Sequence, residues 1–117
     1  MIFLLEKTIT IGKLFDFYGS LLTSRQQEIM KYYFYHDLSL SEIADNLDIS
    51  RQGVHDHLQR AEKQLQQYED KLGLMASYRG LQEQADILRS RLQDDRTLTE
   101  ADRQELLQAV EKISACL

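Results

Sequence analysis

The sequence predicts an all-α fold, in which a head of three or four helices containing a helix-turn-helix precedes a C-terminal amphipathic helical hairpin. The 117 residues include no proline and only five glycines, so little in the chain interrupts helices. Apolar residues also recur at spacings of three and four over most of the chain, as in amphipathic helices. We therefore expect an N-terminal extension at residues 1–10, a helix-turn-helix domain at 11–72 and a hairpin at 73–117.

Two helices are expected ahead of the helix-turn-helix. The first covers about residues 11–22, and the second covers about residues 24–36, with Thr23 as its N-terminal cap. Each has an apolar face at helical spacing. The faces consist of Leu14, Phe15, Tyr18 and Leu22 in the first helix, and of Ile29, Met30, Tyr33 and Phe34 in the second.

The segment at residues 39–65, SLSEIADNLDISRQGVHDHLQRAEKQL, is typical of a helix-turn-helix. Ser39 and Glu42 form a capping-box pair that gives the first motif helix a defined start. Asp48 lies where the turn needs a left-handed residue, a conformation that Asp tolerates better than most residues. Ser50 can then cap the second motif helix by accepting a hydrogen bond from a backbone N–H.

The outward face of the second motif helix is the candidate nucleic-acid interface. Val54 and Leu58 form its inner stripe, so polar residues face outward. These residues are Arg51, Gln52, His55, Asp56, Gln59, Arg60 and Lys63. Arg and Gln pair with guanine and adenine edges, whereas Arg60 and Lys63, further along the helix, suit phosphates. The alternative is a solvated face in a protein–protein module, which the formal net charge of -5 favours, since most DNA-binding domains are basic.

The second motif helix continues as a heptad seam. The seam consists of Leu58, Ala61, Leu65, Tyr68, Leu72 and Met75. Gly73 and Gly80 are expected to bracket a bend. Thr97 or Thr99 is expected to open a last helix that folds back antiparallel. A chain of this size cannot bury all of these apolar stripes alone, so we predict a homodimer.

Other chemistry has little support in the sequence. His55 and His57 lie on different sides of a helix, and no further metal ligands accompany them, so we expect no metal site. No phosphate-binding glycine loop or nucleophile motif occurs, so we expect neither catalysis nor a cofactor. The aromatic run at 32–35 could stack on bases, but core packing is favoured. The single Cys116 and the lack of a membrane-length apolar segment indicate the cytoplasm.

Residues 21–65 resemble region four of bacterial sigma factors, especially those of the extracytoplasmic-function type. The shared positions are Leu22, Gln26, Glu28, Ile29, Leu38, Ser39, Glu42, Ile43, Ala44, Leu47, Ser50, Val54, Leu58, Arg60 and Ala61. Together with the segment LFDFYGSLLT at 14–23, they make the chain similar to the YlxM family of small bacterial helix-turn-helix proteins. This resemblance covers roughly Glu6 to Leu72.

The resemblance also implies a function. YlxM proteins are described as DNA-binding regulators, and the sigma-like motif implies a DNA-facing helix through Arg51, Gln52, His55 and Arg60. Genes of the family lie beside those of the signal recognition particle GTPase Ffh and its receptor FtsY. The resemblance therefore implies a DNA-binding regulatory protein linked to the signal recognition particle pathway. The alternative is an accessory of that particle that binds its GTPase or its RNA rather than DNA.

Overall fold

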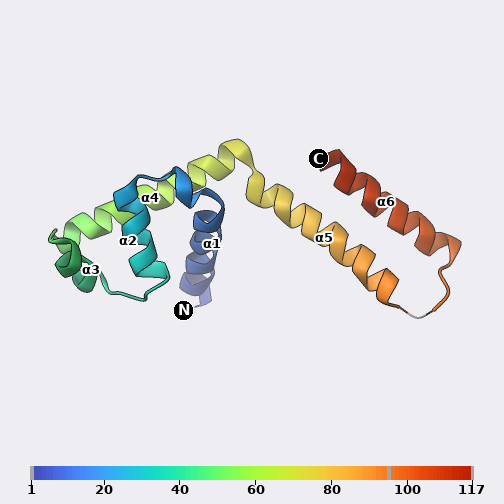
Figure 1. Cartoon of the computed structure of the whole chain (residues 1–117), viewed down its shortest axis with the longest axis horizontal. Helices are drawn as coiled ribbons and strands as arrows, with labels where there is room; N and C mark the ends of the chain where they lie inside the picture. Colours follow the sequence, from blue (N-terminus) through green and yellow to red (C-terminus); the bar gives the residue numbers. More distant parts are fainter. Residues whose placement is uncertain (1, 95, 117) are drawn as a thin grey trace. The chain divides into compact units, whose positions relative to one another are not determined.

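The computed structural model describes residues 2–94 and 96–116, with side chains described from Glu6 onward; Met1, Asp95 and Leu117 lie outside it. Within these ranges the regular structure is entirely helical, which confirms the predicted all-α fold (Figure 1). The helices are α1 (Ile2–Tyr18), a 3-10 turn η1 (Gly19–Leu21), α2 (Ser24–Phe34), α3 (Leu40–Leu47), α4 (Arg51–Leu72), α5 (Leu74–Gln93) and α6 (Glu100–Cys116). They form two compact units, the head at 1–73 and the hairpin at 74–117.

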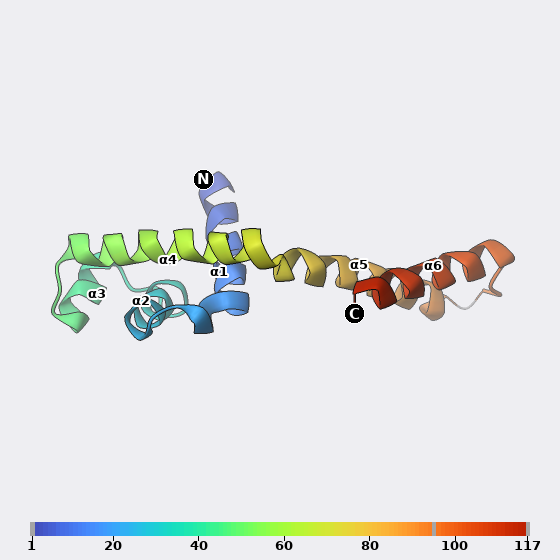
Figure 2. The same cartoon turned by 90° about the horizontal axis from the view of Figure 1, so that it is seen from above.

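In the head, α4 is the helix against which α1, α2 and α3 all pack. Figure 2 shows α1 crossing α4, while α2 and α3 lie on one side of it. The largest fully buried side chains are Tyr18, Ile29, Met30, Ile43, Val54 and Leu65. Because all four helices contribute to this core, the packing of the head determines which face of α4 is buried.

Hydroxyl side chains define the starts of α2 and α3. The Thr23 hydroxyl accepts a hydrogen bond from the Gln26 N–H at 3.2 Å, and the Gln26 side chain accepts one from the Thr23 N–H at 3.1 Å. Ser39 and Glu42 make the same reciprocal pair at 3.1 and 3.2 Å. Both starts therefore agree with the sequence, because each capping box satisfies two backbone donors that the helix itself leaves without acceptors.

The first helix differs from its prediction at both ends. It includes residues 2–10, which contain neither proline nor glycine and so continue the helix toward the N-terminus. It ends at Tyr18, where the 3-10 turn η1 begins, and the ring of Phe15 packs so closely on Gly19 that a Cβ there would lie 2.8 Å from it. Leu22 is buried as predicted, although it lies after the end of α1 rather than within it. The division of the chain into extension, domain and hairpin stays a prediction.

The aromatic run at 32–35 lies at the edge of the core rather than inside it. Tyr33 was expected in the core, but 39% of it is exposed, and α2 ends at Phe34 rather than near residue 36. Consecutive helical residues point about 100° apart, so four aromatic side chains cannot share one buried face. Tyr35 donates a hydrogen bond to the Asp16 carboxylate at 2.8 Å, and this bond is the main cause that raises the pKa of Tyr35.

In the hairpin, α5 and α6 run antiparallel (Figure 1). Gly73 caps α4 with a left-handed φ of 62°, as expected for a bend. Gly80 lies inside α5, so its prediction as the second boundary of the bend is wrong; an isolated glycine costs a helix only about 1 kcal/mol relative to alanine. Arg91 joins the two helices by donating hydrogen bonds of 3.1 and 2.9 Å to one carboxylate oxygen of Glu105.

Side-chain hydrogen bonds define the start of α6. Thr99 and Asp102 form a reciprocal cap there, and Arg96 also donates a hydrogen bond to Asp102. The hydrogen bond from the Thr99 N–H is the main reason that the pKa of Asp102 is lowered.

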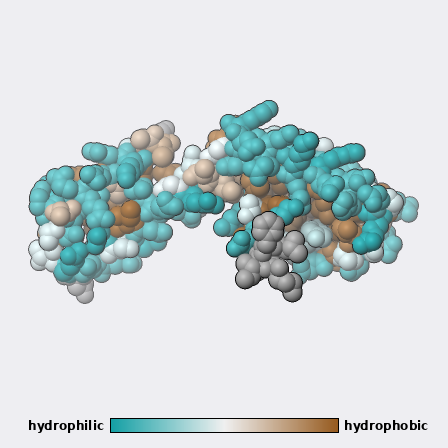
Figure 3. Space-filling model, turned by 180° about the vertical axis from the view of Figure 1, so that it is seen from behind, coloured by the Kyte–Doolittle hydropathy of each residue, from teal (hydrophilic) through white to brown (hydrophobic). Residues whose placement is uncertain are grey.

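The hairpin has very little core of its own. Among the described hairpin residues, only Asp102 and Ala109 are buried. The exposed large apolar side chains are Leu74, Tyr78, Leu92, Leu98, Leu107 and Val110, and Figure 3 shows apolar atoms open on this unit.

Candidate nucleic-acid interface

The turn between α3 and α4 determines where the candidate helix begins. Asp48 adopts the predicted left-handed conformation, with φ 54° and ψ 46°. The N–H of Ile49 donates to the carbonyl of Ala44 at 3.1 Å, which closes the end of α3. The Ser50 hydroxyl then accepts a hydrogen bond from the Gly53 N–H at 2.9 Å. These local bonds make Arg51 the first residue of α4.

The structure places all of the predicted site residues on the exposed side of α4. Val54 is fully buried and Leu58 nearly so, which turns the opposite face of the helix outward. The predicted residues are Arg51, Gln52, His55, Gln59, Arg60 and Lys63, which are exposed, and Asp56, which is half-buried. The outward geometry that a reading helix needs is therefore present, while binding by these side chains stays a prediction.

Four of these residues follow one line along α4. Their spacings of four, three and four residues place them on a common face. They are Gln52, Asp56, Gln59 and Lys63. At about 1.5 Å of rise per residue, this line is roughly 17 Å long. It can therefore follow several base pairs of a major groove.

The charged groups of this face differ in their partners. In the part of the chain that the structure describes, Arg51, Arg60 and Lys63 form no ion pair. Asp56 accepts a hydrogen bond from the Gln52 side chain at 3.0 Å, and its Oδ1 lies 3.8 Å from Nδ1 of His55. Cations without internal partners are available to an anionic ligand, whereas the carboxylate engages its own neighbours.

A shallow hollow of about 310 Å³ lies where α3 and α4 begin. Leu40, Arg51, Gln52 and His55 line it. Leu40 is the one lining residue that the sequence analysis missed. The sequence does show that Leu40 directly follows Ser39, the capping residue of α3. This position places an apolar side chain beside the start of the second motif helix.

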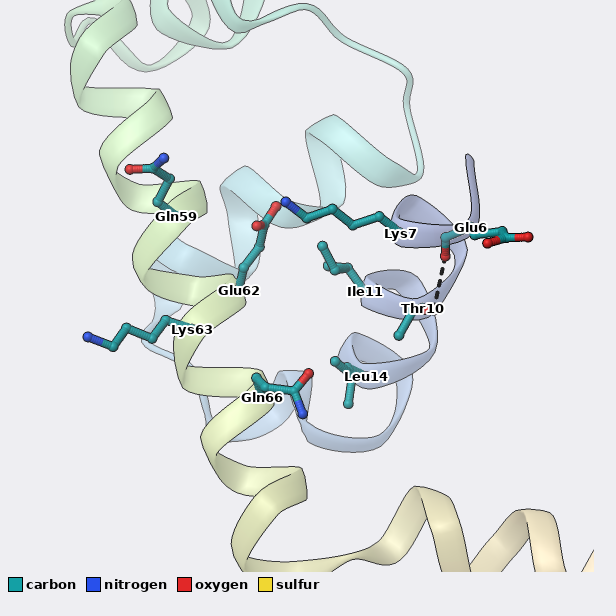
Figure 4. A pocket seen from close by; sticks show the side chains of 9 residues that line it. All are labelled: Glu6, Lys7, Thr10, Ile11, Leu14, Gln59, Glu62, Lys63 and Gln66. Carbon is teal, nitrogen blue, oxygen red and sulfur yellow. Dashed lines mark hydrogen bonds between the residues drawn. The ribbon is translucent and has the colours of Figure 1, made fainter. Parts of the chain in front are cut away.

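A larger groove of about 640 Å³ lies between the N-terminal half of α1 and the middle of α4. Ile11 and Leu14 contribute apolar side chains to it, and Glu62 and Gln66 point toward them from α4 (Figure 4). Figure 4 also shows Lys7 reaching from α1 toward α4. Sequence reasoning missed this groove, because it pairs residues about fifty positions apart and needs α1 to extend before residue 11.

Other site chemistry is not assembled within the described ranges. There, no three His, Cys, Asp or Glu side chains are grouped as a metal site requires. His57 is half-buried on α4, while Cys116 is exposed at the end of α6. Over residues 2–94 and 96–116, no helix combines the length and hydropathy needed to cross a bilayer.

A family model described as "Putative helix-turn-helix protein, YlxM / p13 like" matches residues 5–110. The chain belongs to this family. A YlxM / p13-like relative from Bacillus mycoides is 42% identical over 110 residues, covering 94% of this chain and 99% of the relative. One from Bacillus thuringiensis is 41% identical over the same length, and one from Shouchella clausii is 51% identical over 75 residues, covering 64% of this chain and 69% of the relative.

Membership extends the resemblance found in the sequence. The matched range continues beyond Leu72 through α5 and into α6, so the hairpin belongs to the family pattern as well as the head. YlxM / p13-like proteins are described by a helix-turn-helix rather than by a catalysed reaction. The family therefore indicates nucleic-acid binding, in agreement with the outward face of α4.

Proposed function

We propose that this YlxM / p13-like protein is a DNA-binding regulatory protein that places residues 51–63 of α4 in a major groove. The open polar face of α4 carries this proposal. Its inner face is fixed by the buried Val54 and Leu58, and the α3–α4 turn presents the helix start at the surface. A major groove accommodates one α-helix, and residues near the start of a recognition helix contact base edges.

The charge distribution along α4 is compatible with this role despite the acidity of the chain. Residues 51–63 contain three positive and two negative side chains, whereas the whole chain has a formal net charge of -5. Attraction to phosphates is therefore local and modest, and much of the affinity must come from contacts with base edges. We expect binding to one preferred sequence and weak binding to unrelated DNA.

Alanine variants of α4 test the proposal. Arg51→Ala and Gln52→Ala should each cost about 1–3 kcal/mol of binding free energy and relax sequence preference. Arg60→Ala should weaken binding to all sequences alike and flatten the salt dependence by about one unit of slope. Fluorescence anisotropy measures both effects, on duplexes selected from a randomised pool and on unrelated duplexes.

Arg79→Ala, which removes an exposed arginine from α5, is the matched control and should bind like the wild type. Unchanged binding in all three α4 variants would remove the recognition helix from the mechanism.

We also propose that the protein is a homodimer joined through its hairpins. A two-helix hairpin in which Asp102 and Ala109 are the only buried residues among those described needs further helices to cover its apolar side chains. A second hairpin supplies them as a four-helix bundle. The charges suit this arrangement, since α5 has three positive and two negative side chains while α6 has two and four. Paired heads would then match two DNA half-sites.

Sedimentation measures the predicted dimer. The wild type should sediment at twice the 13.7 kDa mass of the chain, and the double variant Leu107→Glu, Val110→Glu should sediment as a monomer. Both residues are exposed on α6, so their replacement by glutamate places charge in the proposed interface without disturbing a buried core. Gln108→Glu adds a charge to the same helix and should remain dimeric. A wild type that is monomeric at micromolar concentration would exclude the dimer.

The competing hypothesis is an accessory of the signal recognition particle in the cytoplasm. The net charge of -5 favours it, because an acidic protein suits a basic partner surface. Binding to the particle's GTPase or RNA, measured beside binding to duplex DNA at about 0.15 M salt, separates the two hypotheses. Tighter binding to the particle than to any selected duplex would make α4 a protein- or RNA-binding face.

A further inference from the structure

Asp56 is a carboxylate in the middle of the proposed DNA-reading face. It follows Gln52 and precedes Gln59 on the outermost line of α4, and 49% of its side chain is exposed. Its Oδ1 accepts a hydrogen bond from the Gln52 amide at 3.0 Å, which holds the carboxylate above the helix. Within the described ranges, no lysine or arginine pairs with it and no hydrogen bond reaches its Oδ2.

An ionised carboxylate accepts hydrogen bonds and donates none. Phosphates and the N7 and O6 atoms of guanine are also acceptors, so they repel it. Only the amino groups of cytosine and adenine donate in the major groove. On adenine the N6 donor stands beside the N7 acceptor, which would face the second carboxylate oxygen. On cytosine the N4 amino group has no neighbouring acceptor on the same base, so cytosine is the base that fits.

We propose that Asp56 recognises the N4 amino group of a cytosine through its free Oδ2, with Gln52 as the residue that positions it. This inference rests on the proposed DNA binding and names one base of the target. Asp56 confers selectivity mainly by penalising other bases, because guanine and thymine leave a desolvated carboxylate without a donor and adenine places its N7 acceptor against the second carboxylate oxygen. The same charge weakens binding to unrelated DNA.

Selection of duplexes from a randomised pool, followed by anisotropy with the four bases at each selected position, tests the assignment. The wild type should prefer cytosine at one position by about 5- to 100-fold. Asp56→Ala should lose this preference and bind unrelated duplexes more tightly. Asp56→Asn should change the preferred base to adenine, because a carboxamide pairs with both N6 and N7. A merely structural role of Asp56 would not change the preferred base.

Glu62→Gln is the matched control, because it removes one negative charge from the same helix. It should keep the cytosine preference while it also tightens binding to unrelated duplexes. If Asp56→Ala still prefers cytosine at that position, or if Glu62→Gln loses this preference, the assignment is overturned while the proposed DNA binding stands. A wild type that binds no duplex would overturn both.

Discussion

Replacement of Leu65 by alanine should lower the free energy of unfolding by about 2–5 kcal/mol. Leu65 is fully buried on α4, the helix that α1, α2 and α3 share. The substitution removes apolar contact area and leaves a cavity that a four-helix core closes only in part. Since a small domain has about 5–15 kcal/mol of total stability, the variant head should be substantially unfolded at moderately raised temperature.

Urea unfolding followed by circular dichroism measures this loss. Leu72→Ala is the matched control, because it is the same substitution on the same helix at a side chain that is 55% exposed. It should change stability by no more than about 0.5 kcal/mol. Equal losses in the two variants would contradict the packing of α4 against the head.

Replacement of Gly19 by alanine should destabilise the head by about 1–3 kcal/mol through overpacking. A Cβ at this position would lie 2.8 Å from Cε2 and 2.9 Å from Cδ2 of Phe15. Only 6% of Phe15 is exposed, so its ring cannot move aside without disturbing the core. The tight turn from α1 into η1 would have to widen, and thermal unfolding should begin at a lower temperature.

The matched control for Gly19 has the opposite expected sign. Gly12 lies inside α1, and a Cβ there would meet no atom within 4 Å. Gly12→Ala should therefore stabilise the head by about 0.5–1 kcal/mol, because alanine loses less backbone freedom in a helix than glycine. Destabilisation by Gly12→Ala of the size expected for Gly19→Ala would mean that helix α1, rather than the Phe15 contact, is sensitive to substitution.

The motif could be predicted from the sequence because its geometry depends on neighbouring residues. The caps at Ser39 and Ser50 and the left-handed Asp48 each act within four residues of themselves. Helical periodicity then determined which side of α4 is open. The hydrogen bond between Gln52 and Asp56 is also predictable from the sequence, since side chains four residues apart meet on a helix surface.

The features that sequence reasoning missed depend on contacts between distant segments. The groove beside α4 exists because α1 continues before residue 11 and pairs there with residues of α4 about fifty positions later in the sequence. The bend was not expected to end at Gly73 alone, because glycine has a low helix propensity. The helical residues on both sides of Gly80 outweigh that low propensity, and α5 continues through it. Periodicity identifies a helix, but it does not specify which helices pack together.

The shortness of α3 has a consequence for how small an active fragment can be. An eight-residue helix has little stability as an isolated peptide, because helix nucleation is costly, and Ile43 and Ala44 are buried only when the rest of the head is folded. A synthetic peptide of residues 39–65 should therefore be largely unstructured in water. Any truncation meant to retain ligand recognition must keep α1 and α2, although neither carries a side chain predicted to touch DNA.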